Sequence, residues 1–397
     1  MAQAAPDTEL ATEQWTDRKR YLWLFGLLIP TFPFMGGGLA ALTGWDVFWY
    51  IGPVLILIVI PLIDLGSGLD RANPPDDLIK SLEEDKYYRW VTYLYLPLQY
   101  VALVWACWLW SGDSLSLFAE IGLALTVGTV AGVGINTAHE LGHKREKVER
   151  WLAKIALAQS FYGHFYIEHN RGHHVKVATP EDPASARLGE NLYAFLPRTI
   201  GGSVRSAWRL EQPRFKRRNE SHWSIHNDVL NAWLMSLVLW VALVAVFGIR
   251  ILPFLVLQAL VGIVLLETVN YLEHYGLLRQ REKTGRWERV IPAHSWNSNN
   301  IATNVLLYHL QRHSDHHANP TRRYQALRDD QEAPVLPTGY AGMIVLALFP
   351  PIWRRVMDQR VTDHYQGDVT KANIQPSKRE KVLATYGVPQ DVPPLSA

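Results

Sequence analysis

The sequence predicts an all-α integral membrane protein, with six transmembrane helices in three hairpins and a helical cap on the cytoplasmic side. Its formal net charge of +2 and mean hydropathy of −0.04 are averages over a chain in which long uncharged runs alternate with charged segments. Uncharged runs of about 20 residues are long enough to cross the hydrocarbon as helices. Because the runs come in pairs joined by short turns, each pair is expected to form a hairpin.

The first four predicted spans lie within residues 21–138, after a polar N-terminal segment over residues 1–20. That segment has no apolar core, so no signal peptide is expected. Four prolines are expected to kink the helices of the first hairpin, which membrane bundles tolerate when neighbours satisfy the freed backbone groups. The prolines are Pro30, Pro33, Pro53 and Pro61, and the spans are residues 21–44, 45–65, 91–110 and 115–138.

The third predicted hairpin occupies residues 229–273, with spans over residues 229–247 and 251–271. It separates two long charged segments, residues 139–228 and 274–365, which form the predicted cap. The cap is expected to be helical because the spans on either side continue into it.

Two shorter stretches near the C-terminus are assigned separately. The apolar run over residues 341–350 is too short to cross the bilayer and is expected to be interfacial or buried beneath the bundle. The polar, proline-containing tail over residues 366–397 is expected to be a disordered end or a tether to a further domain.

The distribution of basic residues predicts the orientation. With both termini in the cytoplasm, only Arg250 of the 39 Lys and Arg residues falls in the connections on the outer side. Short cytoplasmic loops carry an excess of Lys and Arg, so this orientation is the expected one. The chain is therefore predicted to sit in a membrane, in contact with lipid, with both termini and the cap in the cytoplasm. No nucleic-acid partner is expected.

Eight of the 15 histidines gather in three short clusters within this cap. Neutral imidazole is a good ligand for iron, copper, nickel and zinc, and eight histidines exceed what one tetrahedral zinc needs. The clusters therefore predict a site for two metal ions. They are His139 and His143; His169, His173 and His174; and His313, His316 and His317, with His274 as a lone fourth candidate.

Spacing within the clusters predicts how the ligands are presented. Offsets of three and four place side chains on one helix face, so His139 and His143 are expected to bind one ion together. The three histidines of the third cluster are likewise expected to share one face and to act as three ligands together. On a straight helix, the side chain of His174 would point away from the face that His169 and His173 share. Either the chain turns near Gly172 or His174 serves the second ion. His309 is interpreted as a donor to a ligand. His164, His222, His226, His294 and His364 are left as surface or core residues.

These clusters resemble the histidine boxes of the membrane-bound desaturase and hydroxylase superfamily. The longer strings Asn136 to Lys144, Glu168 to His174, Asn270 to Leu277 and Leu310 to His317, with the continuation Pro320 to Gln325, resemble the bacterial alkane 1-monooxygenases. The match covers most of residues 18–365.

The resemblance implies a non-haem diiron centre, that is two iron ions, with O2 as cosubstrate. It implies hydroxylation of the terminal methyl of medium-chain n-alkanes to 1-alkanols, with electrons from rubredoxin, itself reduced by rubredoxin reductase. It also implies nine metal ligands, which are His139, His143, His169, His173, His174, His274, His313, His316 and His317.

Four carboxylates adjoin these proposed ligands. Carboxylates commonly hold the far nitrogen of a metal-bound imidazole, and neighbours on a helix point apart, so each acid is expected to support a histidine from another segment. Glu267, inside the sixth span, is expected to have a purpose, with an unknown partner. Ala124, Gly128 and Gly132 recur every four residues and are expected to allow close helix packing. The four carboxylates are Glu140, Glu168, Glu273 and Asp315.

Cys107 is the only cysteine, and an iron–sulfur module needs several cysteine ligands, so none is expected in this chain. An electron donor is therefore expected to be a separate protein or domain. The basic cap is expected either to steer such a donor or to follow the positive-inside bias and contact lipid head groups. The candidate basic residues are Lys144, Arg145, Lys147, Arg150, Arg214, Lys216, Arg217 and Arg218.

Three alternative functions stay open at this point. A membrane fatty-acid desaturase or hydroxylase would share the fold and the metals. The string from His139 to His143 fits the His-Glu-x-x-His pattern of a zinc protease, but that function leaves the other clusters unexplained. A metal transporter would need ionisable residues near the middle of the membrane, whereas the clusters all lie on one side.

Overall fold

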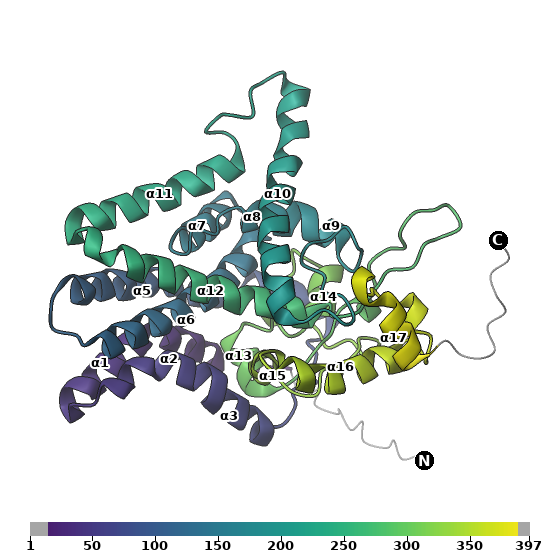
Figure 1. Cartoon of the computed structure of the whole chain (residues 1–397), viewed down its shortest axis with the longest axis horizontal. Coiled ribbons are helices and arrows are strands. Elements are labelled where there is room, and N and C mark those ends of the chain that lie inside the picture. Colours follow the sequence, from purple (N-terminus) through teal and green to yellow (C-terminus); the bar gives the residue numbers. More distant parts are fainter. Residues whose placement is uncertain (1–14, 388–397) are drawn as a thin grey trace, which may run out of the picture.

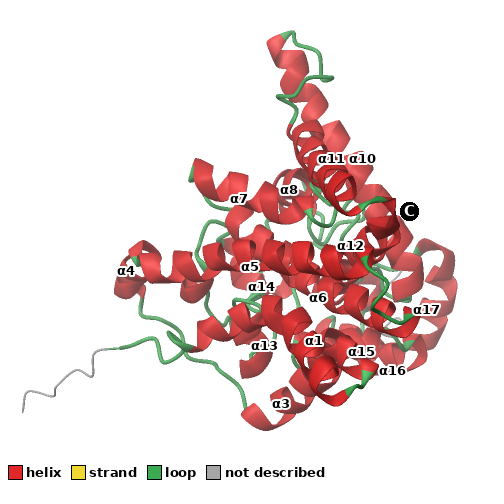
Figure 2. Cartoon of the chain, turned by 90° about the vertical axis from the view of Figure 1, so that its left-hand side faces the viewer, coloured by secondary structure: helices red, strands yellow, loops and turns green. Residues whose placement is uncertain are grey.

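The computed structural model describes residues 15–387 (Figures 1 and 2). The regular secondary structure in that range is helical, and loops join the helices. Within these residues, extended pairing is limited to four isolated β-bridges. Six helices are long and apolar enough to cross a membrane, which confirms the predicted all-α fold with six spans. They are Leu22–Thr43, Asp46–Ser67, Lys86–Ser111, Leu117–Gly142, Asp228–Phe247 and Ile249–Glu273.

The first hairpin is built from helical pieces of different types rather than from two regular helices. Its four prolines lie near the changes of type. Pro30 is the next-to-last residue of the first 3-10 segment, and Pro53 lies two residues before the π-helical segment. Pro33 and Pro61 are the second residues of the α-helical pieces that begin at Phe32 and Ile60. Proline removes a backbone donor, so such changes are expected there. The pieces are η1 (Leu22–Thr31), α1 (Phe32–Thr43), η2 (Asp46–Tyr50), α2 (Ile51–Val54), η3 (Leu55–Val59) and α3 (Ile60–Ser67).

The centre of the bundle is the contact between α6 (Leu117–Gly142) and α12 (Leu252–Glu273). A Cβ atom at Gly128 of α6 would lie 2.5 Å from the Cβ of Val261 and 2.9 Å from the carbonyl oxygen of Gln258, both on α12. Only glycine fits this close approach, which confirms the packing expected of the small-residue repeat. Against this pair pack α5 (Lys86–Ser111) and η6 (Ile249–Ile251), with α11 (Asp228–Phe247) beside them. The short helices η4 (Asp76–Leu78) and α4 (Ile79–Glu84) lie before α5, and α4 contacts η8 (Tyr324–Ala326).

Helix α7 (Lys147–Ala158) turns back from the histidine end of α6 and packs among the spans, against α5, α6 and α11. The carbonyls at the end of a helix need donors, and within a membrane these must be protein groups. Trp240 Nε1 and Gln258 Nε2 donate to the Gln159 carbonyl at 3.1 and 3.0 Å, and Gln99 Nε2 donates to the Ala156 carbonyl at 3.1 Å. Polar side chains on three spans thus satisfy carbonyl groups at the C-terminal end of α7.

Glu267 of α12, whose partner was unknown from the sequence, is buried in a cage of donors. Its carboxylate accepts hydrogen bonds from the Tyr162 hydroxyl at 2.5 Å, the Thr199 hydroxyl at 2.8 Å and the Asn270 amide at 3.1 Å. A buried acid is tolerated when its oxygens are satisfied in this way.

The remaining helices gather mostly at the histidine end of the bundle, and α10 stands across the spans and projects beyond them (Figure 1). The run over residues 341–350 forms α15 and the start of α16, and Tyr340 and Met343 of α15 are fully buried, as the sequence predicts for a buried segment. These elements are α8 (Phe165–Glu168), η5 (His169–His173), α9 (His174–Lys176), α10 (Leu192–Arg218), η7 (Pro292–His294), α13 (Ile301–Leu306), α14 (His313–Ala318), η8 (Tyr324–Ala326), α15 (Tyr340–Ala347), α16 (Pro350–His364), η9 (Val369–Lys371), η10 (Pro376–Lys378) and α17 (Arg379–Tyr386).

The prediction of a disordered end or tether after residue 366 is wrong for the described part of that segment. Val369, Ile374 and Val382 are buried in a hydrophobic cluster with α12 and α16. The Leu188 amide donates to the Asn373 carbonyl at 2.7 Å, so the segment also pairs with the loop before α10. Nothing in the sequence signals this packing, because the segment is polar on average and its apolar residues are few. Residues 388–397 lie outside the described range.

Candidate metal centre

The nine histidines proposed as ligands come together in two groups at the ends of α6 and α12. Donor nitrogens within each group all lie within 4.8 Å of one another. Every one of these residues is buried except His174, which is half-buried. The five-histidine group comprises His139, His143, His169, His174 and His316, and the four-histidine group comprises His173, His274, His313 and His317.

A π-turn explains how the second cluster is divided between the groups. Residues His169–His173 form this turn, and the His174 amide donates to the carbonyl of His169, five residues earlier. A π-turn adds one residue to the helical repeat, so residues five apart share a face. His169 and His174 therefore face the same group, with their Nε2 atoms 3.1 Å apart, while His173 points to the other. The chain path is thus altered near Gly172, and the cluster is also divided, because His173 and His174 lie in different groups.

Helix α14 contributes to both groups, so the expectation that its three histidines act together as one set of ligands is wrong. His313 and His317 lie one turn apart, with Nε2 atoms at 2.9 Å, and belong to the four-histidine group. His316 lies beside them on the helix, but its Nε2 atom is 3.1 Å from that of His174 in the other group. Because both groups use α14, they lie next to each other.

The spacing of the nitrogens fits metal coordination. Two lone pairs facing each other at about 3 Å repel unless a proton or a cation lies between them. Two nitrogens bound at right angles to one ion, each at about 2.1 Å, would lie about 3.0 Å apart. In addition, the buried Nε2 atoms of His139, His143 and His173 have no hydrogen-bond partner among the described residues. The donor set thus fits two ions with nitrogen ligands.

Burial keeps most of these imidazoles in the form that binds metal. Loss of solvation lowers the pKa of His174, His316 and His317, and their mutual repulsion when protonated lowers it further. The same loss of solvation lowers the pKa of His274 to about 3. These four imidazoles are therefore neutral near pH 7, as ligation requires.

Asp182 fixes His173, and sequence reasoning missed it. Its Oδ2 atom lies 2.9 Å from Nδ1 of His173, both side chains are completely buried, and the Ser185 hydroxyl donates to the same oxygen at 2.6 Å. Burial lowers the pKa of His173, but the charge and hydrogen bond of Asp182 outweigh it and raise the pKa overall. An ionised Asp182 holds the proton on Nδ1 and leaves Nε2 free for a metal. Its only signal in the sequence is a position nine residues after His173.

His294, set aside as core or surface, contributes its backbone to the site. The Nδ1 atom of His274 lies 3.1 Å from the His294 carbonyl oxygen, which can only accept a hydrogen bond. Nδ1 therefore carries the proton, and Nε2 faces His313 at 3.2 Å. A carbonyl contact has no residue-type signature, so the sequence could not have indicated it.

The four carboxylates beside the ligands have different surroundings. Glu273 Oε1 lies 3.3 Å from Nδ1 of His313, a histidine on another segment. Glu140 instead pairs with Lys144 at 2.9 Å, and Asp315 pairs with Arg322 at 2.7 Å. Those two acids tie their clusters to basic residues. The remaining acid, Glu168, is buried against the π-turn, with its Oε1 atom unpaired among the described residues.

His309, interpreted from the sequence as a donor to a ligand, belongs to a different contact. Its Nδ1 atom lies 2.8 Å from the Tyr324 carbonyl oxygen, and its Nε2 atom lies 2.8 Å from Nζ of Lys19. Lys19 and Arg312 both pair with Asp70. His309 therefore helps to join the N-terminal segment to the chain before α14, and that interpretation is wrong.

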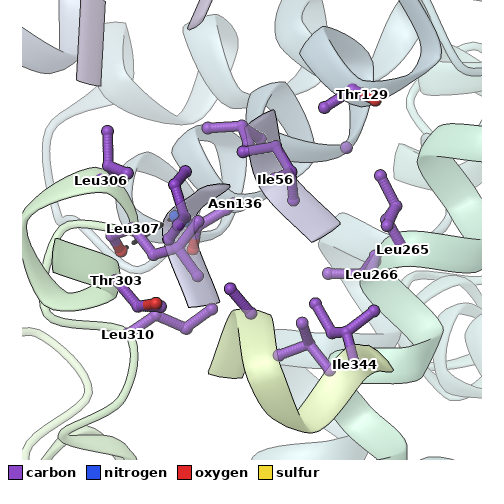
Figure 3. Close-up of a pocket in the computed structure, with 15 residues that line it drawn as sticks. Ile56, Thr129, Asn136, Leu265, Leu266, Thr303, Leu306, Leu307, Leu310 and Ile344 are labelled. Atoms are coloured by element: carbon purple, nitrogen blue, oxygen red, sulfur yellow. Dashed lines mark hydrogen bonds between the residues drawn. The ribbon is translucent and has the colours of Figure 1, made fainter. Parts of the chain in front are cut away.

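An apolar cavity lies between three of the spans and the segments that follow the last span (Figure 3). Ile56, Leu265 and Ile344 line it from three segments far apart in the sequence. Asn136 also lines it, three residues before His139, as does Leu310, three residues before His313. The lining contains three polar residues and no charged one, so the cavity suits an apolar molecule close to both groups.

Comparison with known proteins decides the family. The fatty acid desaturase family model matches residues 116–347, which span all the histidine clusters. The alkane 1-monooxygenase 1 of Alcanivorax borkumensis is 48% identical over 96% of this chain and 95% of its own length. The chain belongs to the alkane 1-monooxygenase family. The Acinetobacter baylyi alkane 1-monooxygenase is 47% identical, over 94% of this chain and 92% of its own length. A more distant relative, the xylene/toluene monooxygenase hydroxylase component of Pseudomonas putida, is 29% identical over 58% of this chain and 62% of its own length.

Membership of the alkane 1-monooxygenase family makes this chain a multi-pass membrane oxidoreductase that holds a metal. It displaces the zinc protease and transporter alternatives. Two of the basic residues predicted to steer an electron carrier already have other partners: Lys144 is buried beside Glu140, and Arg214 pairs with Glu211 and Asp228. The other six are exposed.

Proposed function

We propose that this protein hydroxylates the terminal methyl group of medium-chain n-alkanes to give 1-alkanols, using O2 and two iron ions. The two adjoining histidine groups beneath an uncharged cavity carry the proposal. A fatty-acid desaturase or hydroxylase is the second candidate. A fatty acyl substrate brings a polar head that needs a polar partner, and the cavity offers only Thr129, Asn136 and Thr303.

The reaction consumes the alkane, O2, two electrons and two protons, and it releases the alkanol and water. Iron supplies the redox chemistry that activates O2, which amino-acid side chains and zinc do not offer. The nine histidines would hold the two ions, five at one and four at the other. Asp182 and Glu273 would hold the proton on Nδ1 of His173 and His313, which leaves the Nε2 atom of each histidine free to bind metal.

The protein's own contribution to selectivity is the shape and dryness of the cavity. An alkane has no polar group to bind, so its end must be placed by contacts with side chains such as Leu265 and Ile344. Three spans line the cavity together with segments that follow the last span, so an alkane dissolved in the bilayer would reach it between the spans. Excluding water protects the oxidising centre from side reactions.

We place the chain in a bacterial inner membrane with the histidine groups on the cytoplasmic side, because the basic residues concentrate there. Electrons would come from rubredoxin, reduced by rubredoxin reductase. His174 is the one proposed ligand that is not fully buried, and its neighbour Val175 is 65% exposed. The surface around these two residues therefore offers a carrier its closest approach to the metals.

The test begins with iron and zinc analysis of the purified chain, followed by incubation with octane, reduced rubredoxin and O2. About two irons per chain and formation of 1-octanol are expected. One zinc and no iron would overturn the proposal. Two irons with oxidation of a fatty acyl substrate and none of octane would establish the second candidate instead. If the rate at which rubredoxin reduces this chain does not depend on ionic strength, electrostatic steering is excluded.

A further inference from the structure

A strongly basic pocket lies between α7, α10 and α11, apart from the metal groups and the apolar cavity. Its volume is about 250 Å³, several times the roughly 30 Å³ that one water molecule occupies. It is therefore large enough for a polar group of several atoms. Five cationic residues and a single acid line it: Lys147, Arg150, Lys154, Arg171, Arg214 and Asp228.

The cations of this basic pocket outnumber the carboxylates available to them. Asp228 pairs with Lys154 at 2.8 Å, with Arg171 at 3.0 Å and with Arg214 at 2.9 Å. Glu211 pairs with the same two arginines, at 2.5 and 2.9 Å. Two carboxylates thus serve three cations.

Lys147 and Arg150 add two further charges that have no carboxylate partner among residues 15–387. Both are exposed. Together, five cations and two carboxylates leave a formal excess of three positive charges. Lys147 also lies in the first turn of the 12-residue α7, where the partial positive charge of the helix end adds to the attraction for an anion.

The basic pocket sits at the boundary of the membrane. The span α11 begins at Asp228, which forms one wall of the pocket, and α7 runs from the pocket back among the spans. Trp151, 50% exposed, lines the pocket beside Tyr166, and the neighbouring Val148 is also exposed. Aromatic residues of this kind favour the level of the lipid head groups. In Figure 1, α7 lies below α11 and to the left of α10.

We propose that this basic pocket binds the phosphodiester head group of an anionic phospholipid. The head group would meet Lys147 and Arg150 at the rim and the arginine–carboxylate network within, while its acyl chains continue along the apolar surface by Val148 and Trp151. Basic pockets between helices at this level of a membrane bind such head groups. A free phosphate would be drawn by the same charges but would gain nothing from the apolar rim.

The proposal has a consequence for the metal groups. Arg171 belongs to the π-turn that carries His169 and His173, and it is held by Glu211 of α10 and Asp228 of α11. A bound phosphodiester would share the charge of Arg171 with these two acids. The lipid would thereby stabilise the junction that positions the π-turn.

The experiment compares thermal unfolding of the full chain in phosphatidylcholine nanodiscs with and without phosphatidylglycerol. The lipid is expected to raise the unfolding temperature of the wild-type chain. In the Lys147→Gln/Arg150→Gln variant this gain should largely disappear, since each cation contributes about fivefold in affinity and the pair roughly 30-fold. Both residues are exposed, so the variant should fold normally. Arg217→Gln/Arg218→Gln, an exposed basic pair on α10 that does not line the pocket, is the matched control.

Two outcomes would overturn the proposal. One is an equal gain from phosphatidylglycerol in the pocket variant and in wild type, which would assign the effect to general surface charge. The other is an equal gain from inorganic phosphate added to phosphatidylcholine nanodiscs, which would make the ligand a soluble anion. The unfolding readout does not depend on alkane oxidation, so neither result bears on the proposed reaction.

Discussion

Replacing Asp182 with asparagine tests how the four-histidine group would hold the ion proposed for it. In the native site, Oδ2 of Asp182 faces Nδ1 of His173 at 2.9 Å and also accepts from Ser185, while Oδ1 accepts from the Ala184 amide at 3.1 Å. Asparagine has the same shape but only one acceptor oxygen. With its amide nitrogen toward His173, it would drive the proton of His173 from Nδ1 to Nε2, the atom proposed to bind metal. With the amide turned round, its nitrogen would face the Ala184 donor.

Either arrangement should weaken the ion held by His173. Loss of a carboxylate that orients a ligand typically costs about 10- to 100-fold in metal affinity, which corresponds to about 1.4 to 2.8 kcal/mol. We expect graded chelator to remove one ion from Asp182→Asn at a concentration about 10- to 100-fold lower than from wild type. The second ion, held by the five-histidine group, should be lost at the wild-type concentration.

The assay is metal content per chain after dialysis against a chelator series, with circular dichroism to confirm folding. Asp363→Asn serves as the control, because Asp363 is exposed and lies outside both histidine groups. Equal loss of both ions would contradict the assignment of Asp182 to one group. Unchanged retention of both ions would refute the reasoning that the carboxylate fixes the proton on Nδ1.

Three further predictions address other contacts. Glu273→Gln should reduce metal retention by about tenfold, because it replaces the carboxyl group 3.3 Å from Nδ1 of His313; metal content after dialysis measures it. Gly128→Ala should lower the free energy of unfolding by about 1 to 3 kcal/mol, because its Cβ would clash with Val261; detergent-dependent thermal unfolding measures it. Burial raises the pKa of Asp70, but its cationic and hydrogen-bonding neighbours lower it well below the usual value. The stability that Asp70 contributes is therefore present above pH of about 4 and lost as pH falls below it, a dependence that Asp70→Asn should flatten.

Each of these predictions has an outcome that contradicts it. Full iron occupancy and activity in Glu273→Gln would remove that residue from the site. Gly38→Ala, where an added Cβ meets nothing within 4 Å, should be nearly neutral, and an equal effect at both glycines would exclude the close helix contact. An Asp70→Asn variant with the acid sensitivity of wild type would show that other groups dominate there.

The sequence predicted the spans and the ligand candidates because both depend on local patterns. Uncharged runs of span length are set by the thickness of the bilayer, and histidines at offsets of three and four follow from the helical repeat. Their assignment to two groups depends on one added residue in the π-turn at His169–His173, which does not alter the spacing written in the sequence. The division of α14 between both groups likewise depends on where the other ligands lie.

The contacts that hold the ligands were harder to foresee than the ligands themselves. Asp182 reaches His173 across a loop, and the His294 carbonyl reaches His274 across 20 residues. Neither contact follows a helical offset. The packed segment after residue 366 was missed because three buried side chains, Val369, Ile374 and Val382, are enough to dock a segment that is polar on average.

The closure of α7 by side chains from later spans constrains how the protein is made. The Gln159 carbonyl accepts from Trp240 and Gln258, which are synthesised about 80 and 100 residues after it. Before those residues arrive, the free end of α7 would present unpaired carbonyls to lipid, at several kcal/mol each. The helix must therefore wait at the membrane surface during translation and enter only when α11 and α12 are in place. The two histidine groups are completed later still, because His313, His316 and His317 of α14 follow α12 in the chain.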